Sequence, residues 1–258
     1  MVVKMGSGLQ VEEREGVTWL RIQRPEVRNA FDPPLLAELT AAVRSSQAGV
    51  LVITGSDGAF CAGGHLGELA EPDPERLREL FEGALRLFTE IRSHPSPVIA
   101  AVNGPAVGGG NELVVACDLA IAAESAIFGQ TGPKVGSAPV LGGTNLLALS
   151  IGEKRAKEVS FLCRRYTARE ALAMGWINAV VPDEDLEAEV MRWARELLGT
   201  SRRYLEIAKL SSNAWWNLCQ ESFRSGVGML VQAIGSEDML EGARAFREKR
   251  PPRFPSRR

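Results

Sequence analysis

Three consecutive glycines, Gly108 to Gly110, stand between an apolar segment, residues 97–102, and a helix-like segment that begins at Asn111. The first N–H groups of a helix lack partners within the helix, and the peptide dipoles favour negative charge at that end. Because glycine has no Cβ, another molecule can approach this backbone closely. The turn is therefore a candidate site for a phosphate or for the oxyanion that develops on a carbonyl oxygen. A tight turn that needs glycine for its conformation alone is the alternative interpretation.

Glu112 follows three residues after Gly109. About one helical turn separates the two positions, so the carboxyl group is expected beside the glycine turn. Burial raises the pKa of a carboxyl group, which can then act as an acid or a base near neutral pH. The alternative is a structural role, because an acidic residue in the first turn of a helix interacts favourably with the helix dipole.

A second turn of small residues, 58–66, reads G-A-F-C-A-G-G-H-L and follows the apolar segment 50–54. Two turns, each at the end of a buried strand, can present backbone N–H groups to one carbonyl oxygen. An enolate oxygen held in this way would gain about 3–4 kcal/mol from each donor. The glycine-rich turn contains neither the G-x-G-x-x-G dinucleotide pattern nor the P-loop pattern.

These stretches resemble motifs of the crotonase (enoyl-CoA hydratase/isomerase) superfamily. Residues 58–66 resemble its A-F-x-A-G-A-D-L turn, and residues 103–122 resemble its G-G-G-x-E-L-x-x-x-C-D motif. Residues 171–182 resemble its A-x-x-x-G-L-V-N-x-V-V-P stretch, and residues 24–31 and 246–250 match the two ends of the family pattern. The resemblance spans essentially the whole chain, and several motifs in the same order are far more specific than any one of them.

The resemblance implies a catalytic site made of backbone and one side chain. It places the thioester carbonyl of an acyl-CoA substrate between the N–H groups of Gly64 and Gly109, and it makes Glu112 a catalytic acid or base. The family usually has alanine where this chain has Gly64, but a backbone donor survives that change. Catalysis of this kind needs no metal and no redox cofactor, and coenzyme A enters as part of the substrate.

The resemblance also implies residues that contact coenzyme A. The positions that match the family's contacts are Val27, Arg28, Ala62, Phe246 and Lys249. The last two belong to a C-terminal pair that often reaches the ligand from a neighbouring subunit, and the family resemblance implies a homotrimer or hexamer. Residues 241–258 hold seven Lys or Arg against two Asp or Glu, which suits a phosphate-rich ligand; the alternative is a solvated tail.

The sequence departs from the hydratase pattern at Gly132, where hydratases carry a second glutamate. The string 128–137, F-G-Q-T-G-P-K-V-G-S, instead resembles dihydroxynaphthoyl-CoA synthases, in some of which the glycine makes room for bicarbonate as the base. Pro139 and Ser160 stand where those synthases have aspartate and tryptophan, and the synthases generally lack a glutamate at position 112. Gly132 is therefore a candidate substrate-binding position, with bicarbonate as a candidate co-reactant.

A third group, the ring-opening oxocyclohexene-carbonyl-CoA hydrolases, combines G-G-G-x-E with F-G-Q-T-G-P and G-S-A-P, as this chain does. We therefore expect an enoyl-CoA hydratase-like enzyme that adds water to an α,β-unsaturated acyl-CoA, open-chain or cyclic. A ring-opening hydrolase and a synthase-like carbon–carbon lyase are the alternatives within enzymes. A non-catalytic acyl-CoA-binding or RNA-binding protein is the alternative of another class.

Strand-like and helix-like segments alternate along the first 150 residues. Short apolar runs at 17–22, 50–54, 97–102 and 119–122 predict buried strands, and helices are expected between them at 35–43, 71–91 and 111–117. This alternation predicts an α/β fold with crossover connections. The family resemblance implies a crotonase-like spiral of ββα repeats over residues 1–150, followed by a helical part for trimerisation over residues 151–258.

Composition excludes several other classes of protein. A net charge of −2 argues against a nucleic-acid-binding protein that works by bulk electrostatics. Four cysteines without C-x-x-C spacing argue against a structural zinc site and for reduced core residues. Residues 1–10 lack a signal-peptide run, and no window holds 18 uninterrupted apolar residues. We therefore expect a cytoplasmic protein without nucleic-acid or membrane partners.

Overall fold

The computed structural model describes residues 2–4, 6–65 and 72–255. Leu66, at the end of the predicted 58–66 turn, and Glu71, the predicted start of a helix, lie outside these residues. The main sheet has the strand order β1-β2-β3-β4-β5-β7-β10. Its strands are β1 (Val2–Lys4), β2 (Leu9–Arg14), β3 (Val17–Ile22), β4 (Val50–Thr54), β5 (Val98–Val102), β7 (Leu119–Ala123) and β10 (Ala179–Val181).

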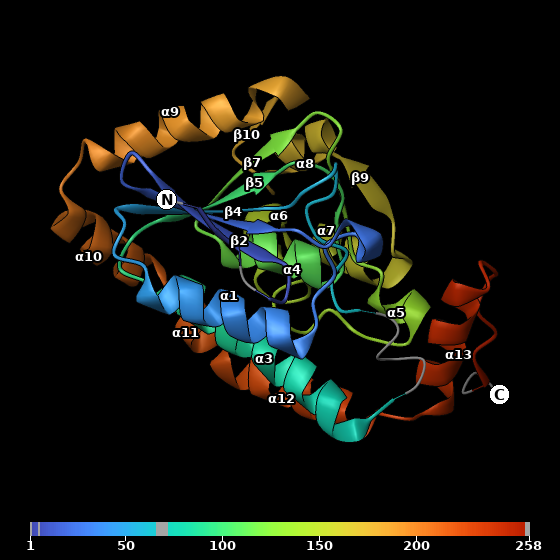
Figure 1. The fold of residues 1–258 in the computed structure, drawn as a ribbon. Helices are drawn as coiled ribbons and strands as arrows, with labels where there is room; N and C mark the ends of the chain where they lie inside the picture. The colour runs from blue at the N-terminus through green and yellow to red at the C-terminus, as the bar shows by residue number, and fades with distance from the viewer. Residues whose placement is uncertain (1, 5, 66–71, 256–258) are drawn as a thin grey trace.

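The first three strands of this sheet are antiparallel, and the strands from β3 to β10 are parallel. Every residue of β4 and β5 is buried, as expected for strands that are covered on both faces. Helix α9 (Leu186–Leu198) covers one face, while α1 (Pro33–Ser45) and α3 (Pro74–Ser93) lie on the other (Figure 1). The predicted strands at 17–22, 50–54, 97–102 and 119–122 are thereby confirmed to within a residue.

Side chains of each central strand alternate between two hydrophobic clusters. Val50 and Val52 pack with α9, whereas Leu51 and Ile53 pack in the larger cluster on the side of α1 and α3. The period of two residues is the geometry of a β-strand.

Local sequence explains where the two helices on that side begin. The Asp32 carboxylate accepts a hydrogen bond from the Leu35 N–H at 3.0 Å, and proline occupies the first helical position of α1. The Asp73 carboxylate caps α3 in the same way, with the Glu75 N–H at 2.9 Å. Acidic caps and an N-terminal proline are typical helix starts.

A second, smaller sheet leads into the glycine turn at residues 108–110. It has the order β6-β8-β9 and consists of β6 (Ala106–Val107), β8 (Ile127–Gly129) and β9 (Arg165–Thr167). Strands β6 and β8 are parallel, and β8 and β9 are antiparallel. Helix α4 (Gly109–Ala116) begins directly after β6. The short helices α5 (Gly132–Val135) and α6 (Leu147–Ile151) follow β8.

The part after residue 150 is mainly helical, as predicted. Its helices are α7 (Glu153–Leu162), α8 (Ala168–Met174), α9, α10 (Arg202–Ser212), α11 (Ala214–Leu218), α12 (Gln220–Gln232) and α13 (Glu237–Arg247). The boundary near residue 150 needs one correction, because β9 and β10 lie beyond it and pair with β8 and β7. These strands have three residues each, too few for a hydrophobic period to reveal them.

No helix among the described residues is long and apolar enough to cross a membrane.

Candidate active site

The two predicted turns are in direct contact. The Phe31 N–H donates to the Gly63 carbonyl at 2.7 Å, and the Val107 N–H donates to the Cys61 carbonyl at 3.1 Å. A Cβ added to Gly63 would lie 2.7 Å from the backbone nitrogen of Gly109. A Cβ added to Gly109 would lie 3.6 Å from the backbone nitrogen of Gly64. The amides of Gly64 and Gly109 are therefore neighbours, although the residues are 45 positions apart in the chain.

Both amides lack an acceptor among the described residues. Within residues 2–4, 6–65 and 72–255, no oxygen accepts a hydrogen bond from the N–H of Gly64 or from that of Gly109. For Gly109 this follows from its position as the first residue of α4, since the first N–H groups of a helix have no partner within it. Two neighbouring unpaired donors are the chemical requirement for binding a developing oxyanion.

Glycine is needed here for steric reasons as well. Gly63 has a φ of 88°, a left-handed conformation that side chains disfavour. A Cβ at Gly110 would lie 2.0 Å from the Cys61 carbonyl oxygen, which is far inside van der Waals contact. The turn therefore needs glycine for its own conformation and for the close approach of the two loops. A turn that needs glycine for its conformation can also bind an oxyanion, so the two interpretations of the glycine turn at 108–110 are compatible.

Glu112 lies in the first turn of α4, and 6% of its surface is exposed. Its Oε1 accepts hydrogen bonds from the Leu141 N–H at 2.7 Å and from the Gly143 N–H at 3.2 Å. Burial raises the pKa of this carboxyl group to about 7, although the two N–H donors act in the opposite direction. Oε2 has no partner among the described residues. The group is held by one oxygen and is able to exchange a proton near neutral pH through the other.

Gly132, the position where hydratases carry a second glutamate, lies against a following loop. A Cβ at this position would lie 3.0 Å from the Cα and nitrogen of Ala138 and 3.0 Å from the Ser137 carbonyl oxygen. The loop at 137–138 thus packs onto the glycine and occupies the place of the first side-chain atom. Glycine is therefore the residue that this packing accommodates, and the role of Gly132 in binding substrate or bicarbonate stays a prediction.

Two buried amides near Glu112 escaped the sequence analysis. The side-chain nitrogen and oxygen of Asn111, and those of Gln130, are buried without a hydrogen-bond partner in the described structure. The Gln130 Nε2 lies 2.4 Å from where a Cβ on Gly143 would stand, so this amide lies against the loop that holds Glu112. Asn111 could have been noticed in the sequence, because it is a polar residue at the start of an otherwise largely apolar helix.

Three of the predicted coenzyme A positions, Val27, Arg28 and Ala62, lie together. The Ala62 N–H donates to the Arg28 carbonyl at 3.1 Å, with Val27 one residue before. The buried Asn29 fixes this loop: its Nδ2 donates to the carbonyls of Ser56 at 3.0 Å and Ala59 at 2.8 Å. Asn29 has a positioning role that sequence reasoning missed, although the residue belongs to a quoted motif.

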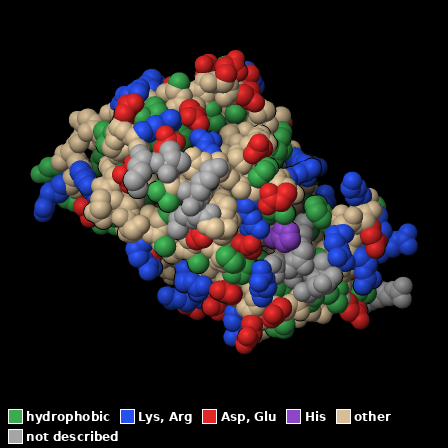
Figure 2. Space-filling view, in the orientation of Figure 1, with side chains coloured by type: hydrophobic (Ala, Val, Ile, Leu, Met, Phe, Trp, Pro, Cys, Tyr) green, Lys and Arg blue, Asp and Glu red, His purple; other side chains and the backbone are tan. Residues whose placement is uncertain are grey.

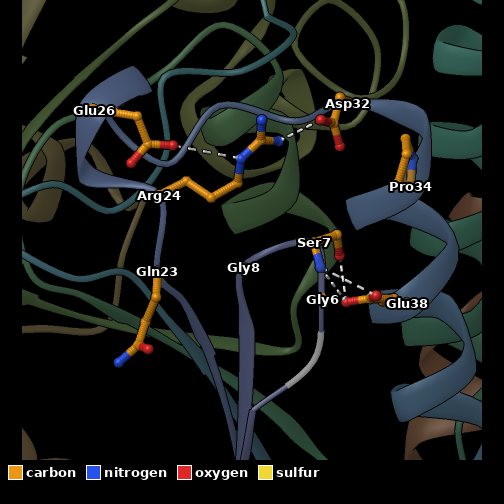
Figure 3. Close-up of a pocket in the computed structure, with 9 residues that line it drawn as sticks. All are labelled: Gly6, Ser7, Gly8, Gln23, Arg24, Glu26, Asp32, Pro34 and Glu38. Carbon is orange, nitrogen blue, oxygen red and sulfur yellow. Dashed lines mark hydrogen bonds and ion pairs between the residues drawn. The ribbon is translucent and has the colours of Figure 1, made fainter.

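Arg24 also stabilises the loop that contains Val27 and Arg28. Its guanidinium donates to the Ala30 carbonyl at 3.2 Å and pairs with Asp32 at 2.8 Å and Glu26 at 3.9 Å (Figure 3). Arg24, Glu26 and Asp32 border a cavity of about 560 Å³ that Glu38 also lines. Glu26 and Asp32 pair with the Arg24 guanidinium, and Glu38 accepts a hydrogen bond from the Ser7 N–H at 3.2 Å. The cavity lining therefore carries more negative than positive charge, which disfavours the phosphates of coenzyme A.

The other two predicted contacts, Phe246 and Lys249, lie at the end of α13. Phe246 is 55% exposed, and Lys249 has a φ of 53°. Helix α13 packs on α5 at one end of the molecule (Figure 1), where a Cβ on Gly242 would lie 2.3 Å from the nitrogen of Gly136. Lys and Arg side chains are numerous over this end (Figure 2). Among the described residues, no hydrogen bond or ion pair links Phe246 or Lys249 to Gly64 or Gly109.

Comparisons with known proteins identify the family of this chain. Residues 12–257 match the family model described as enoyl-CoA hydratase/isomerase. An enoyl-CoA hydratase from Mycobacterium avium subsp. paratuberculosis is 30% identical with a TM-score of 0.87, over 96% of this chain and 98% of that one. An enoyl-CoA hydratase from Bacillus anthracis is 32% identical with a TM-score of 0.77, over the same shares of the two chains.

A human relative, enoyl coenzyme A hydratase domain-containing protein 3, is 30% identical with a TM-score of 0.74, over 96% of this chain and all of the other. The fold of these relatives is that of the crotonases, and the family match covers nearly the whole sequence. The chain belongs to the enoyl-CoA hydratase/isomerase family.

Proposed function

We propose that this enzyme adds water to an α,β-unsaturated acyl-CoA, open-chain or cyclic, through an enolate bound by the N–H groups of Gly64 and Gly109. One observation carries the proposal. The carboxyl group of Glu112, whose pKa burial raises to about 7, lies one helical turn from the Gly109 amide, which neighbours the Gly64 amide; neither amide has an acceptor among the described residues. This observation supports the proposal, because enolate chemistry needs a proton-transfer group beside an oxyanion site.

The reaction would proceed by proton relay through Glu112. Oε2 of the Glu112 carboxylate accepts a proton from water while the water oxygen bonds to Cβ of the substrate. The C=C electrons move onto the thioester oxygen, where Gly64 and Gly109 donate hydrogen bonds to the enolate. The enolate then collapses, and Cα takes the proton back from Glu112. The product is a 3-hydroxyacyl-CoA, and the carboxylate is regenerated.

Coenzyme A would lie along the loop of Val27 and Arg28 and beside Ala62, which the Arg28 carbonyl holds in place. The exposed Phe246 and the basic Lys249 would close over the ligand from a neighbouring subunit. We propose a homotrimer or hexamer for this reason. Exposed apolar side chains support an interface on the C-terminal helices; they are Tyr204, Ile207, Leu210, Trp215 and Leu218.

A second candidate deserves a test because position 132 carries no carboxyl group. A single acid–base residue also suits ring opening or carbon–carbon bond cleavage through the same enolate. Product mass separates the two: hydration adds one water to an intact acyl group, whereas ring opening yields a dicarboxylate. A rate that rises with added bicarbonate would favour a synthase-like reaction in which bicarbonate serves as the missing base.

The proposed enolate can be tested without knowing the natural acyl group. Butanoyl-CoA is incubated with the enzyme in D₂O, and deuterium at Cα is measured by mass spectrometry. We expect exchange with the native enzyme and at least a hundredfold slower exchange with Glu112→Gln. Binding of a panel of acyl-CoA esters without exchange or turnover would instead indicate a non-catalytic acyl-CoA-binding protein.

A further inference from the structure

Lys209 of α10 is a buried cation far in sequence from the proposed site. Its side chain is 4% exposed, and its Nζ pairs with the Asp118 carboxylate at 2.7 Å. The same Nζ donates to the carbonyls of Ile91 and Ser96, each at 2.9 Å. Burial lowers the pKa of Lys209, while the charge of Asp118 opposes this effect. All three donor positions of the ammonium group are therefore used, and none faces solvent.

Two of the three acceptors lie at helix ends, and the third, the Ser96 carbonyl, lies in the loop between α3 and β5. Ile91 lies in the last turn of α3, and Asp118 follows Cys117, the C-cap of α4. Carbonyl groups at a helix C-terminus attract a cation, and a carboxylate there is unfavourable unless it is neutralised. The Asp118 Oδ2 also accepts a hydrogen bond from the Val98 N–H at 2.8 Å, at the start of β5. Lys209 thus joins the C-terminal ends of α3 and α4 to the central sheet.

The opposite parts of these helices reach the two amide donors. Gly109 is the first residue of α4, about 13 Å from Asp118 along the helix axis. Leu80 of α3 lies behind the other donor: its Cδ2 is 3.4 Å from where a Cβ on Gly64 would stand. Helices α3 and α4 also contact one another directly. A change in their relative placement would therefore move Gly64 and Gly109 with respect to each other.

We propose that Lys209 is a positioning residue for the oxyanion site, which it sets by joining α3 and α4 at the ends remote from Gly64 and Gly109. The inference rests on the proposed function of those two amides. It gives the C-terminal helices a role in catalysis, because one of their side chains fixes the geometry of donors that lie in the first half of the chain. A displacement of about 1 Å at such a site can cost a hundredfold in rate.

The test compares two anchors of the same helical region. Lys209→Met removes the link to Asp118, Ile91 and Ser96. Asn213→Ala is the control: Asn213 is 5% exposed, and its Nδ2 donates to the Arg92 carbonyl at 2.7 Å, with no contact to Asp118. Both substitutions weaken the attachment of the C-terminal helices, and only the first touches α4. Exchange of the Cα protons of butanoyl-CoA in D₂O is measured per folded molecule, well below the unfolding temperature.

We expect Lys209→Met to lower the maximal exchange rate at least tenfold, with less than a threefold change in the butanoyl-CoA concentration at half-maximal rate. Asn213→Ala should lower the melting temperature while its maximal rate per folded molecule stays within twofold of native. A purely structural role for Lys209 would change stability alone. Lys209→Arg, which keeps the charge and the donors, should recover part of the lost rate.

If Lys209→Met does not fold, the double variant Lys209→Met/Asp118→Asn replaces it. This pair removes both charges and keeps an amide oxygen to accept from the Val98 N–H. A native maximal rate in the double variant, or an equal loss in Asn213→Ala, would overturn the inference. Glu112→Gln separates the two proposals: if it abolishes exchange while the double variant exchanges normally, the proposed function stands and the role of Lys209 does not.

Discussion

Each end of helix α4 carries a carboxyl group, buried at Glu112 and half-buried at Asp118, and the two groups have different electrostatic settings. Glu112, in the first turn, has no ion-pair partner among the described residues, and burial raises its pKa to about 7. Asp118, just beyond the last turn, pairs with Lys209 at 2.7 Å. The difference teaches how one short helix serves two purposes. The carboxyl group without a cation can exchange protons near neutral pH, while the paired one fixes the position of the helix.

Replacing Glu112 by glutamine tests the N-terminal half of this contrast. Glutamine keeps an acceptor for the Leu141 and Gly143 N–H groups but takes no proton, so we expect kcat for hydration to fall about 10²- to 10⁴-fold. KM should change little, because coenzyme A contacts are untouched. Steady-state kinetics with crotonyl-CoA, or with whichever enoyl-CoA of a panel is turned over, provides the measurement. Near-native kcat would assign Glu112 to structure alone.

Replacing Asp118 by alanine tests the C-terminal half. The change leaves the Lys209 charge buried and unpaired and removes the acceptor of the Val98 N–H, so we expect a loss of about 3–5 kcal/mol in the free energy of unfolding. Urea denaturation followed by circular dichroism measures it. Asp183→Ala, which removes an exposed carboxylate that accepts from the Ser125 N–H, is the control and should cost much less. Equal losses would mean that the buried pair has no special importance.

Gly109→Ala asks whether the first amide of α4 is a donor in the reaction. The added methyl group would lie 3.3 Å from the Gly63 Cα and 3.6 Å from the Gly64 nitrogen, between the two proposed donors. We expect kcat to fall about 10²-fold. Gly228→Ala is the matched control, because it makes the same change in helix α12, where a Cβ meets no atom within 4 Å. Similar activity of the two variants would remove Gly109 from the site.

The pH dependence of activity tests whether the pKa of Glu112 is raised to about 7, as expected for a buried carboxyl group without a cation beside it. Hydration starts from the carboxylate, so kcat/KM should fall about tenfold for each pH unit below a pKa near 7 and level off above it. Profiles of kcat/KM from pH 5 to pH 9 provide the measurement. A plateau that extends down to pH 5 would mean that the carboxyl group titrates near its ordinary value and is not desolvated.

The same raised pKa predicts that the stability of the fold decreases as the pH rises, whereas the activity increases. In the unfolded chain Glu112 titrates near 4.5, so between about pH 4.5 and 7 the folded protein holds a proton that the unfolded chain has lost. This contribution to stability is fully present below about pH 4.5 and is lost as the pH rises to about 7; it amounts to about 3 kcal/mol. Glu112→Gln should therefore gain stability relative to the native enzyme as the pH rises, as measured by urea unfolding at pH 5 and pH 8. An equal difference at both values would contradict the raised pKa.

Much of the central fold could be predicted from the sequence because it depends on local patterns. Runs such as Val50–Thr54 are continuously apolar, and only a strand covered on both faces suits them. Prolines and acidic caps mark the starts of α1 and α3. Helices α10 and α11 are separated at Asn213, whose side chain donates to the Arg92 carbonyl of α3 instead of facing solvent. That contact joins residues 121 positions apart and leaves no local signal.

The sequence by itself determined the types of group available for chemistry: glycine turns after two buried strands and a glutamate one helical turn beyond the second. Only the tertiary structure decided that the two turns touch, that burial raises the pKa of Glu112, that the 137–138 loop packs onto Gly132, and that Lys209 neutralises Asp118. The physical reason is the separation along the chain of the residues that interact. Hydrophobic periodicity and helix caps act over a few residues, whereas burial and pairing depend on segments that folding brings together from distant parts of the chain.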